Sequence, residues 1–285
     1  MKSKSRYLPP ESEASSRISR PELTRLASLK TKKGRKKAGL FLAEGVRLLE
    51  DALKHHRLPR KLFLYPPEIN DRAQALVESF RSKKVPTETI SSRDFHRLVE
   101  TKSPQGLLGV FDIPEQKFNS EIARKARRVL VAENINDPGN LGALLRSALG
   151  FGFELILLVG DCVEPFNSKV VRSTAGAIFA SRVMNCNLDE LRSLTEGGAL
   201  RLLVTDIDGE TEDKWFDRDS NLNMNSGALA VAVGAESVGA SPELRELAYK
   251  KIRIAQSPIL ESLNAGIAGS IVMHRVYVHD SSHSS

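Results

Sequence analysis

ENINDPGNLGALLR, residues 133–146, is the stretch of sequence that decides the fold. The apolar residues 129–132 precede it and predict a buried strand. Residues 136–139 favour a turn, because proline fixes one φ angle and glycine tolerates a positive φ. Asn140 then occupies the expected N-cap of a helix whose leucines repeat at helical spacing. With a further apolar run at 153–159, the order strand, loop, helix, strand predicts an α/β fold.

Arg146 lies off the apolar seam of this helix, roughly 140° around the axis from Leu141 at about 100° per residue. A guanidinium two turns beyond a polar loop, at the carboxyl end of a strand, is placed to meet an anion or a ribose oxygen. A surface arginine on an ordinary helix between two strands explains the residue equally well. The stretch alone leaves both interpretations open.

Composition narrows the class of protein. The 285 residues predict two domains, and 41% hydrophobic and 27% charged residues are typical of a soluble globular chain. The net charge of +7 favours a polyanionic partner such as nucleic acid, although many basic proteins are merely soluble. Cys162 and Cys186 have no CxxC spacing, which argues against a zinc site or a disulfide framework and suits a reducing compartment. We therefore expect a cytoplasmic protein without a bound metal, a secretory leader or a membrane-spanning helix.

Alternating helical and strand patterns predict two α/β domains. We expect a disordered polar tail at 1–18, a first domain at 19–113, a linker at 114–120 and a second domain at 121–280. Helices are predicted at 19–29, 46–53, 71–81, 95–99 and 167–181. Strands are predicted at 40–43, 61–65, 87–90, 107–111, 202–205, 229–233 and 252–256, with a polar connection at 206–226.

A basic run follows the first predicted helix. We interpret it as a loop that is either a solvated charge cluster or a phosphate-contacting segment, with equal weight. The predicted RNA-contacting residues are Lys30, Lys32, Lys33, Arg35, Lys36 and Lys37.

A second informative stretch starts at the end of the predicted strand 229–233. Gly234 would allow a ligand to approach the backbone closely, and Gly239 would supply a tight turn. Ser241 and the proline after it predict the start of a helix. Glu236 is then a carboxylate at the same sheet edge as Asn140, although a structural glutamate is the simpler reading. The stretch is not GxGxxG and lacks the main signature of a dinucleotide site.

The third stretch follows the predicted strand 252–256. Ser262 and Asn264 stand at the mouth of a helix, where they either cap it or hydrogen-bond a ligand. Ala265, Ala268 and Gly269 have the spacing of small residues in tightly packed helices.

Together the three stretches resemble the motifs of the SpoU-type (TrmH-like) RNA ribose 2′-O-methyltransferases of the SPOUT superfamily. The matches are NxxDPxNxGxxxR at 134–146, GxExxGxS at 234–241 and SLNAxxA at 262–268. GLFLAEGVRLLEDAL and SPQGLLGVF, in the first domain, resemble that family's substrate-binding domain, an α/β RNA-binding fold similar to certain ribosomal proteins. Two departures stand out: Ile-Ala-Gln at 254–256 replaces the usual Ile-Pro-Met, and Ala265 replaces the valine of SLNV.

The resemblance implies a C-terminal parallel-sheet SPOUT domain with a trefoil knot, S-adenosylmethionine as methyl donor, a homodimer, and no metal. It implies that the donor contacts Gly234, Glu236, Gly239, Ile254, Gln256 and Leu263. It implies catalytic roles for Asn140, Arg146, Glu236, Ser262 and Asn264. Because the pKa of arginine lies above about 12, we assign Arg146 to stabilisation of the developing oxyanion rather than to proton abstraction.

Ribosomal RNA is the favoured substrate and tRNA the second, because the layout with a basic N-terminal domain resembles the rRNA-modifying branch. A non-catalytic RNA-binding or ribosome-assembly factor on the same fold is the alternative, and a nucleotide-binding metabolic enzyme is a third, weaker one.

Overall fold

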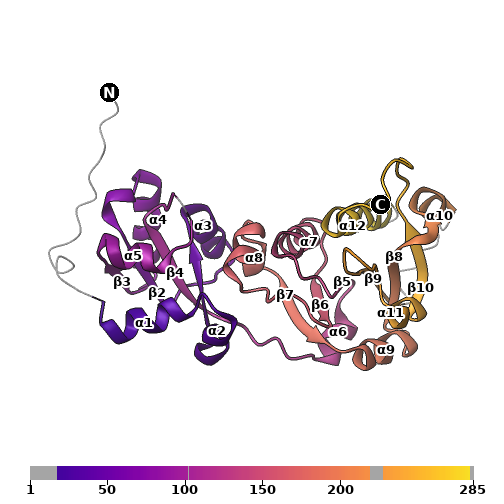
Figure 1. Cartoon of the computed structure of the whole chain (residues 1–285), viewed down its shortest axis with the longest axis horizontal. Coiled ribbons are helices and arrows are strands. Elements are labelled where there is room, and N and C mark those ends of the chain that lie inside the picture. Colours follow the sequence, from indigo (N-terminus) through magenta and orange to yellow (C-terminus); the bar gives the residue numbers. More distant parts are fainter. Residues whose placement is uncertain (1–17, 102, 219–226, 283–285) are drawn as a thin grey trace. The chain divides into compact units, whose positions relative to one another are not determined.

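Two sheets organise the chain in the computed structural model, which describes residues 18–101, 103–218 and 227–282 (Figure 1). One compact unit contains the chain up to Pro114 together with Phe166–Phe179, and the other contains Glu115–Pro165 and the chain from Ala180 onward. The prediction placed all residues after 120 in the second domain, whereas Phe166–Phe179 belong to the first unit. The predicted tail lies outside the described residues except for Ile18, which is buried.

The first unit contains a four-stranded sheet in the order β1-β4-β2-β3, in which β4 is antiparallel to both of its neighbours. Its strands are β1 (Leu40–Glu44), β2 (Lys61–Leu64), β3 (Thr87–Thr89) and β4 (Leu107–Asp112). Its helices are α1 (Arg20–Ser28), α2 (Lys32–Ala38), α3 (Val46–Lys54), η2 (Pro66–Glu68), α4 (Asp71–Ser82) and α5 (Ser92–Leu98). The four predicted strands of this unit and the helices predicted before residue 100 are confirmed.

The predicted basic loop at residues 30–37 is wrong, because most of it forms helix α2. Thr31 caps the helix, its hydroxyl oxygen accepting the Gly34 amide at 3.0 Å. Gly39, at φ 64°, ends it and donates its amide to the Arg35 carbonyl at 2.7 Å. Lysine and arginine are good helix formers, so a cap at each end suffices despite the repulsion of like charges.

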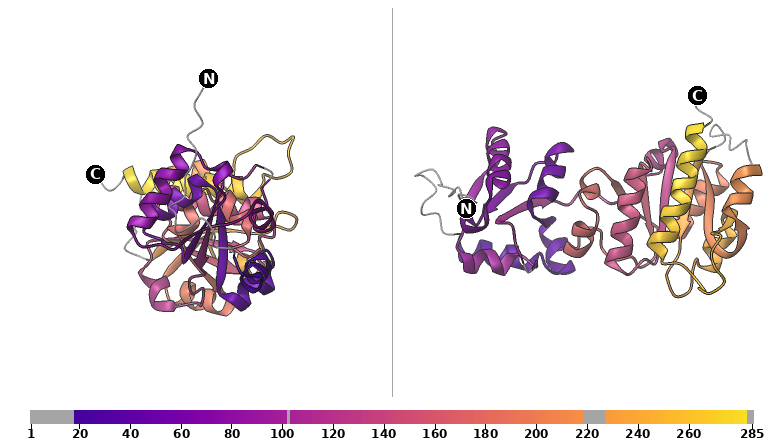
Figure 2. Two further views of the ribbon diagram at one scale, coloured as in Figure 1. Left: turned by 90° about the vertical axis from the view of Figure 1, so that its left-hand side faces the viewer. Right: turned by 90° about the horizontal axis from the view of Figure 1, so that it is seen from above.

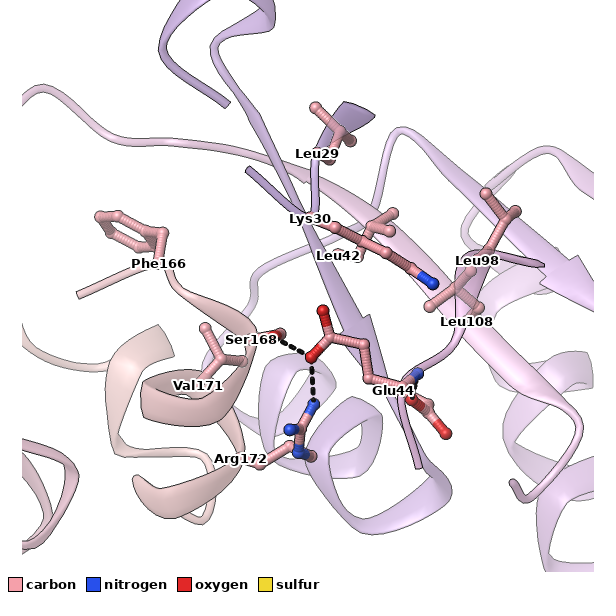
Figure 3. A pocket seen from close by; sticks show the side chains of 11 residues that line it. Leu29, Lys30, Leu42, Glu44, Leu98, Leu108, Phe166, Ser168, Val171 and Arg172 are labelled. Atoms are coloured by element: carbon pink, nitrogen blue, oxygen red, sulfur yellow. Dashed lines mark hydrogen bonds and ion pairs between the residues drawn. The ribbon is translucent and has the colours of Figure 1, made fainter. Parts of the chain in front are cut away.

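The segment Phe166–Phe179 completes the first unit. It contains α8 (Ser168–Ser173) and η3 (Ala177–Phe179), and the rings of Phe166 and Phe41 lie 4.9 Å apart. Glu100 accepts from the Ser168 hydroxyl and the Arg172 guanidinium beside a small pocket (Figure 3). That pocket holds about 20 Å³, little more than one water molecule, so we assign it no ligand.

The second unit contains a parallel sheet in the order β10-β8-β9-β5-β6-β7, which confirms the predicted α/β class. Its strands are β5 (Arg128–Glu133), β6 (Leu155–Val159), β7 (Arg182–Cys186), β8 (Leu200–Thr211), β9 (Ala228–Val233) and β10 (Ala248–Arg253). Its helices are α6 (Ser120–Lys125), α7 (Pro138–Gly150), α9 (Leu188–Glu196), α10 (Glu212–Arg218), α11 (Pro242–Glu246) and α12 (Ala265–Ser282). Figure 1 shows α7 and α12 on one face of the sheet and α6, α9 and α11 on the other.

Three further predictions of local structure are wrong. The helix predicted at 167–181 stops at Ser173, because Ala175 and Gly176 have φ angles of 46° and 93°. The strand predicted at 252–256 is instead Ala248–Arg253, so residues 254–256 begin a loop. The polar connection predicted at 206–226 contains the end of β8 and helix α10, and residues 219–226 lie outside the described chain.

Small residues let α12 lie close to α7 and β9, as the view from above shows (Figure 2). A Cβ added to Gly269 would overlap the Leu144 side chain and come within 2.8 Å of Val233. The predicted close-packing stripe therefore serves contacts within one chain. In the described residues, no helix is both long and apolar enough to span a bilayer.

Candidate active site

The three sequence motifs lie on loops that leave the carboxyl ends of β5, β9 and β10 in the parallel sheet. β5 and β9 are neighbours, and β8 separates β9 from the edge strand β10. The carboxyl edge of a parallel sheet is where α/β proteins bind ligands. The topology therefore brings together residues that are more than 120 positions apart, such as Asn140 and Asn264.

Glu133 joins the first motif to the second. It is the last residue of β5, is 2% exposed, and accepts the Ser241 amide at 2.8 Å and the Ser241 hydroxyl at 2.6 Å. The same hydroxyl oxygen accepts the Leu244 amide and caps α11, which confirms the predicted helix start. Sequence reasoning missed Glu133, although a carboxylate that ends an apolar strand was a usable signal, since a buried charge needs partners.

Asn140 joins the first motif to the third. The Asn264 side-chain amide donates to the Asn140 side-chain oxygen at 2.8 Å, and Asn140 is 7% exposed. The predicted N-cap role of Asn140 is wrong, because Asp137 caps α7 by accepting the Asn140 backbone amide at 2.9 Å. Proline at the first helical position shifts the cap back to Asp137 and frees the Asn140 side chain to face Asn264.

Asn264 has the capping role, one of the two that the sequence left open, and it also contacts Asn140. Its side-chain oxygen accepts the Ile267 amide at 3.2 Å at the start of α12, while its amide nitrogen donates to Asn140. Arg146 is exposed on α7 while Leu141, Leu144 and Leu145 are buried, so its predicted position off the apolar seam is confirmed.

A cavity of about 760 Å³ lies between the loops after β9 and β10, beside the end of β8. All six residues predicted to contact the methyl donor line it, as do two of the predicted catalytic residues, Glu236 and Ser262. The predicted catalytic residues Asn140, Arg146 and Asn264 are not among those that line the cavity within this chain. Cavities of roughly 300–1,000 Å³ are typical of small-molecule and cofactor sites.

Two glycines shape one wall of the cavity. A Cβ on Gly234 would overlap the backbone of Gly239 and Ala240, so the close approach that this glycine allows is made by the chain itself. Gly234 also lines the cavity, so the predicted approach of a ligand to its backbone stays a prediction. Gly239, at φ 70°, forms the predicted tight turn, and residues 235 and 239 pair as an isolated antiparallel bridge.

The charged residues of the lining are three carboxylates and two guanidinium groups, namely Asp206, Glu236, Glu261, Arg245 and Arg253. Glu236 and Glu261 are exposed to the cavity, and the carboxylate of Asp206 is fully buried. Arg245 forms an ion pair with Asp206, with 3.1 Å between Nε and Oδ2. With Asp206 paired to Arg245, the two exposed carboxylates outnumber the exposed Arg253 by one, so the lining has a small excess of negative charge.

The two cysteines are free thiols in the second unit. Burial raises the pKa of Cys186 to about 12 and also raises the pKa of Cys162. Burial therefore disfavours the thiolate form of both side chains.

The predicted RNA-contacting residues separate into two groups. Arg35 is 2% exposed and donates its guanidinium to the Leu29 carbonyl at 2.7 Å, so we withdraw it from the set. Lys30 is half-buried and donates to the Val99 carbonyl at 3.0 Å, and we withdraw it too. The four exposed lysines of α2 remain, and these are Lys32, Lys33, Lys36 and Lys37.

Comparison with known proteins identifies the family. The model of the SpoU rRNA Methylase family matches residues 127–274, and the model of the MRM3-like substrate binding domain matches residues 20–109. A protein of Synechocystis sp. named uncharacterized tRNA/rRNA methyltransferase is 30% identical over 255 residues, which cover 89% of each chain. The 23S rRNA (guanosine(2553)-2′-O)-methyltransferase RlmP of Bacillus subtilis is 26% identical over 248 residues, which cover 87% of this chain and 92% of that protein.

The fold also matches a solved structure, the AdoMet-bound rRNA methyltransferase from Sinorhizobium meliloti. The TM-score is 0.76 at 22% identity, with 93% of this chain and 98% of that chain covered. Since the first family model covers more than half of the sequence, this chain belongs to the SpoU rRNA methylase family.

Proposed function

We propose that this protein transfers a methyl group from S-adenosylmethionine to the 2′-hydroxyl of a ribose in ribosomal RNA. The observation that carries the proposal is that donor-contact residues predicted from two separate motifs line one cavity at the carboxyl edge of the parallel sheet. The first motif adjoins it through the hydrogen bond from Asn264 to Asn140.

The residues present fit S-adenosylmethionine. The cavity of about 760 Å³ accommodates a nucleoside with an amino-acid tail. Val233, Ile254 and Leu263 supply apolar lining, and Glu236 and Glu261 supply negative charge that suits a sulfonium cation. When bound, S-adenosylmethionine supplies an activated methyl group.

The chain's own residues would then orient the ribose and stabilise charge. A ribose hydroxyl is a poor nucleophile at neutral pH, so the site must stabilise negative charge that develops on its oxygen. We assign that role to Arg146, with Asn140 and Glu236 fixing the local network and Ser262 and Asn264 positioning ribose and donor. The Asn264–Asn140 hydrogen bond supports the assignment, because it fixes the orientation of two side-chain amides, that of Asn140 on α7 and that of Asn264 just before α12.

Ribosomal RNA is the proposed substrate for three reasons. The first unit matches a substrate-binding-domain model, the family is named for rRNA methylation, and the relative in Bacillus subtilis is named as acting on 23S rRNA. The exposed lysines of α2 offer positive charge to a phosphate backbone. Transfer RNA is the alternative outcome of the experiment below.

We also propose that the protein is a knotted homodimer in the cytoplasm. Large apolar side chains are exposed on the paired helices α7 and α12, and a partner subunit that packs there would bury them. These residues are Leu149, Ile267, Tyr277 and Val278. The chain leaves the edge strand β10 and returns across β8 to pack α12 on β9 and α7, which is compatible with a trefoil knot. The free thiols suit a reducing compartment.

The test is methyl transfer from labelled S-adenosylmethionine to rRNA and tRNA transcripts, followed by mapping of 2′-O-methyl sites. We expect label at a ribose of rRNA with the native chain and none with Arg146→Ala. RNA binding without label under any condition would identify a non-catalytic factor instead. Label in tRNA alone would refute the choice of rRNA. Sedimentation at assay concentrations tests the dimer.

A further inference from the structure

The end of β8 reaches the cavity by an irregular pairing with β10. Residues 248–251 of β10 pair with residues 202–204, and after a register shift Ile252 and Arg253 pair with Glu210 and Thr211. Gly209 permits this, because a Cβ there would lie 2.7 Å from the Lys251 carbonyl carbon and 2.8 Å from the Arg253 amide nitrogen. The last part of β8, residues 206–211, thus places the start of α10 next to the end of β10.

At that point Glu212, the first residue of α10, meets Ala255. Its carboxylate Oε2 accepts the Ala255 backbone amide at 2.8 Å. The helix that carries Glu212 is itself fixed, because Trp215 and Phe216 are buried and the Phe216 ring lies 5.8 Å from His279 of α12. The carboxylate therefore projects from an anchored element.

Ala255 stands in the loop 254–264, which forms one wall of the cavity and is drawn in gold in Figure 2. The loop is exposed along much of its length, with Ile259 89% exposed. Asn264 ties its far end to Asn140, and Glu212 ties its near end through Ala255. Because the peptide unit is planar and trans, holding the Ala255 N–H also fixes the direction of the Ile254 carbonyl, which belongs to the same unit.

Alanine at position 255 stands where the resemblance described above implies a proline. A proline would fix φ and would have no N–H to satisfy, whereas alanine leaves φ free and presents a donor. The Glu212–Ala255 bond both restricts the backbone and satisfies that donor. We propose that Glu212 is a positioning residue of the S-adenosylmethionine site, which holds the Ile254–Ala255 peptide so that the cavity wall is preorganised. The inference rests on the proposed donor site.

Calorimetric titration of the full chain with S-adenosylmethionine tests the inference. Because Glu212 acts on the donor only through the cavity wall, we expect Glu212→Ala to raise Kd by about two- to tenfold, less than the loss of a direct hydrogen bond to a charged group would. Glu212→Gln, which keeps an acceptor, should have a smaller effect. Glu246→Ala, an exposed carboxylate on α11 that does not line the cavity, is the matched control and should leave Kd unchanged. In turnover, Glu212→Ala should raise KM for the donor and leave kcat at saturation unchanged.

A second substitution shows whether Glu212 acts through the Ala255 amide. Ala255→Pro removes the donor, so Glu212→Ala should have no further effect on Kd in that background. An equal effect of Glu212→Ala with and without the proline would overturn the inference.

Hydrogen exchange of the ligand-free protein decides the matter even if the proline variant does not fold. Peptides covering residues 252–258 should exchange faster in Glu212→Ala than in the native chain or Glu246→Ala, and unchanged exchange would overturn the inference. Failure of the native chain to bind S-adenosylmethionine would instead remove the donor site, which is a separate result from native binding that Glu212→Ala leaves unaltered.

Discussion

Ser241→Ala is the substitution that most directly tests how the first two motifs are held together. The serine hydroxyl donates to the buried Glu133 carboxylate at 2.6 Å and accepts the Leu244 amide at 3.1 Å as the cap of α11. Loss of a helix cap costs about 1 kcal/mol, and loss of a hydrogen bond to a charged group costs about 1.5–3 kcal/mol. We therefore expect the free energy of unfolding to fall by about 2.5–4 kcal/mol.

A matched control separates the cost of losing the helix cap from the cost of losing the hydrogen bond to Glu133. Asn187 caps α9 in the same unit by accepting the Glu190 amide at 2.8 Å, so Asn187→Ala should lower the free energy of unfolding by about 1 kcal/mol. Ser241→Thr keeps a hydroxyl and should lose less than Ser241→Ala. Urea unfolding followed by circular dichroism measures all three variants. If Ser241→Ala and Asn187→Ala differ by less than about 0.5 kcal/mol, the contact between Glu133 and the Ser241 hydroxyl does not hold the loop, and the reasoning fails.

Three more predictions concern chemistry, RNA and pH. Arg146→Ala should abolish methyl transfer and leave the melting temperature unchanged, because the side chain is exposed. A large fall in the melting temperature would show that Arg146 packs in the core. Replacing the four exposed lysines of α2 by serine should weaken rRNA binding and flatten its salt dependence, by about 0.7–0.9 in log–log slope per lost phosphate contact, and an unchanged slope would exclude α2 from the interface. Since burial raises the pKa of Cys186 from 9.0 to about 12, the thiolate is disfavoured in the folded state, so stability should fall as pH rises from about 9 towards 12. Cys186→Ala should lack that part of the decline in pH-dependent unfolding.

Apolar runs were sufficient to predict most strands, because a strand buried on both faces needs consecutive hydrophobic residues and few other segments have them. Residues 129–132 and 229–233 are examples that became β5 and β9. The extension of β8 past Val204 could not be predicted in the same way, since its sequence is polar and its pairing depends on a register shift with β10.

The parts of the site that were missed depend on side-chain partners. Asp137 rather than Asn140 caps α7, and the proline that follows Asp137 was the available signal. Arg35 belongs to a run of cations, and only the fold shows that its guanidinium is turned inward to the Leu29 carbonyl. The Glu133–Ser241 contact joins residues 108 positions apart, which no local pattern specifies.

The geometry of the sheet explains why the loop 254–264 needs a tie at each end. Three strand spacings separate β10 from β5, a distance of about 14 Å, whereas the residues of the loop could extend to about 36 Å. Because the loop is longer than the distance that it spans, it curves away from the sheet and leaves space beneath it, where the cavity of about 760 Å³ lies. A long loop also has many alternative backbone conformations, and ordering one of its residues costs roughly 1–2 kcal/mol in backbone entropy. Contacts at the two ends, Glu212 with Ala255 and Asn264 with Asn140, limit that freedom before a ligand arrives, so less of the binding free energy is spent on ordering the wall.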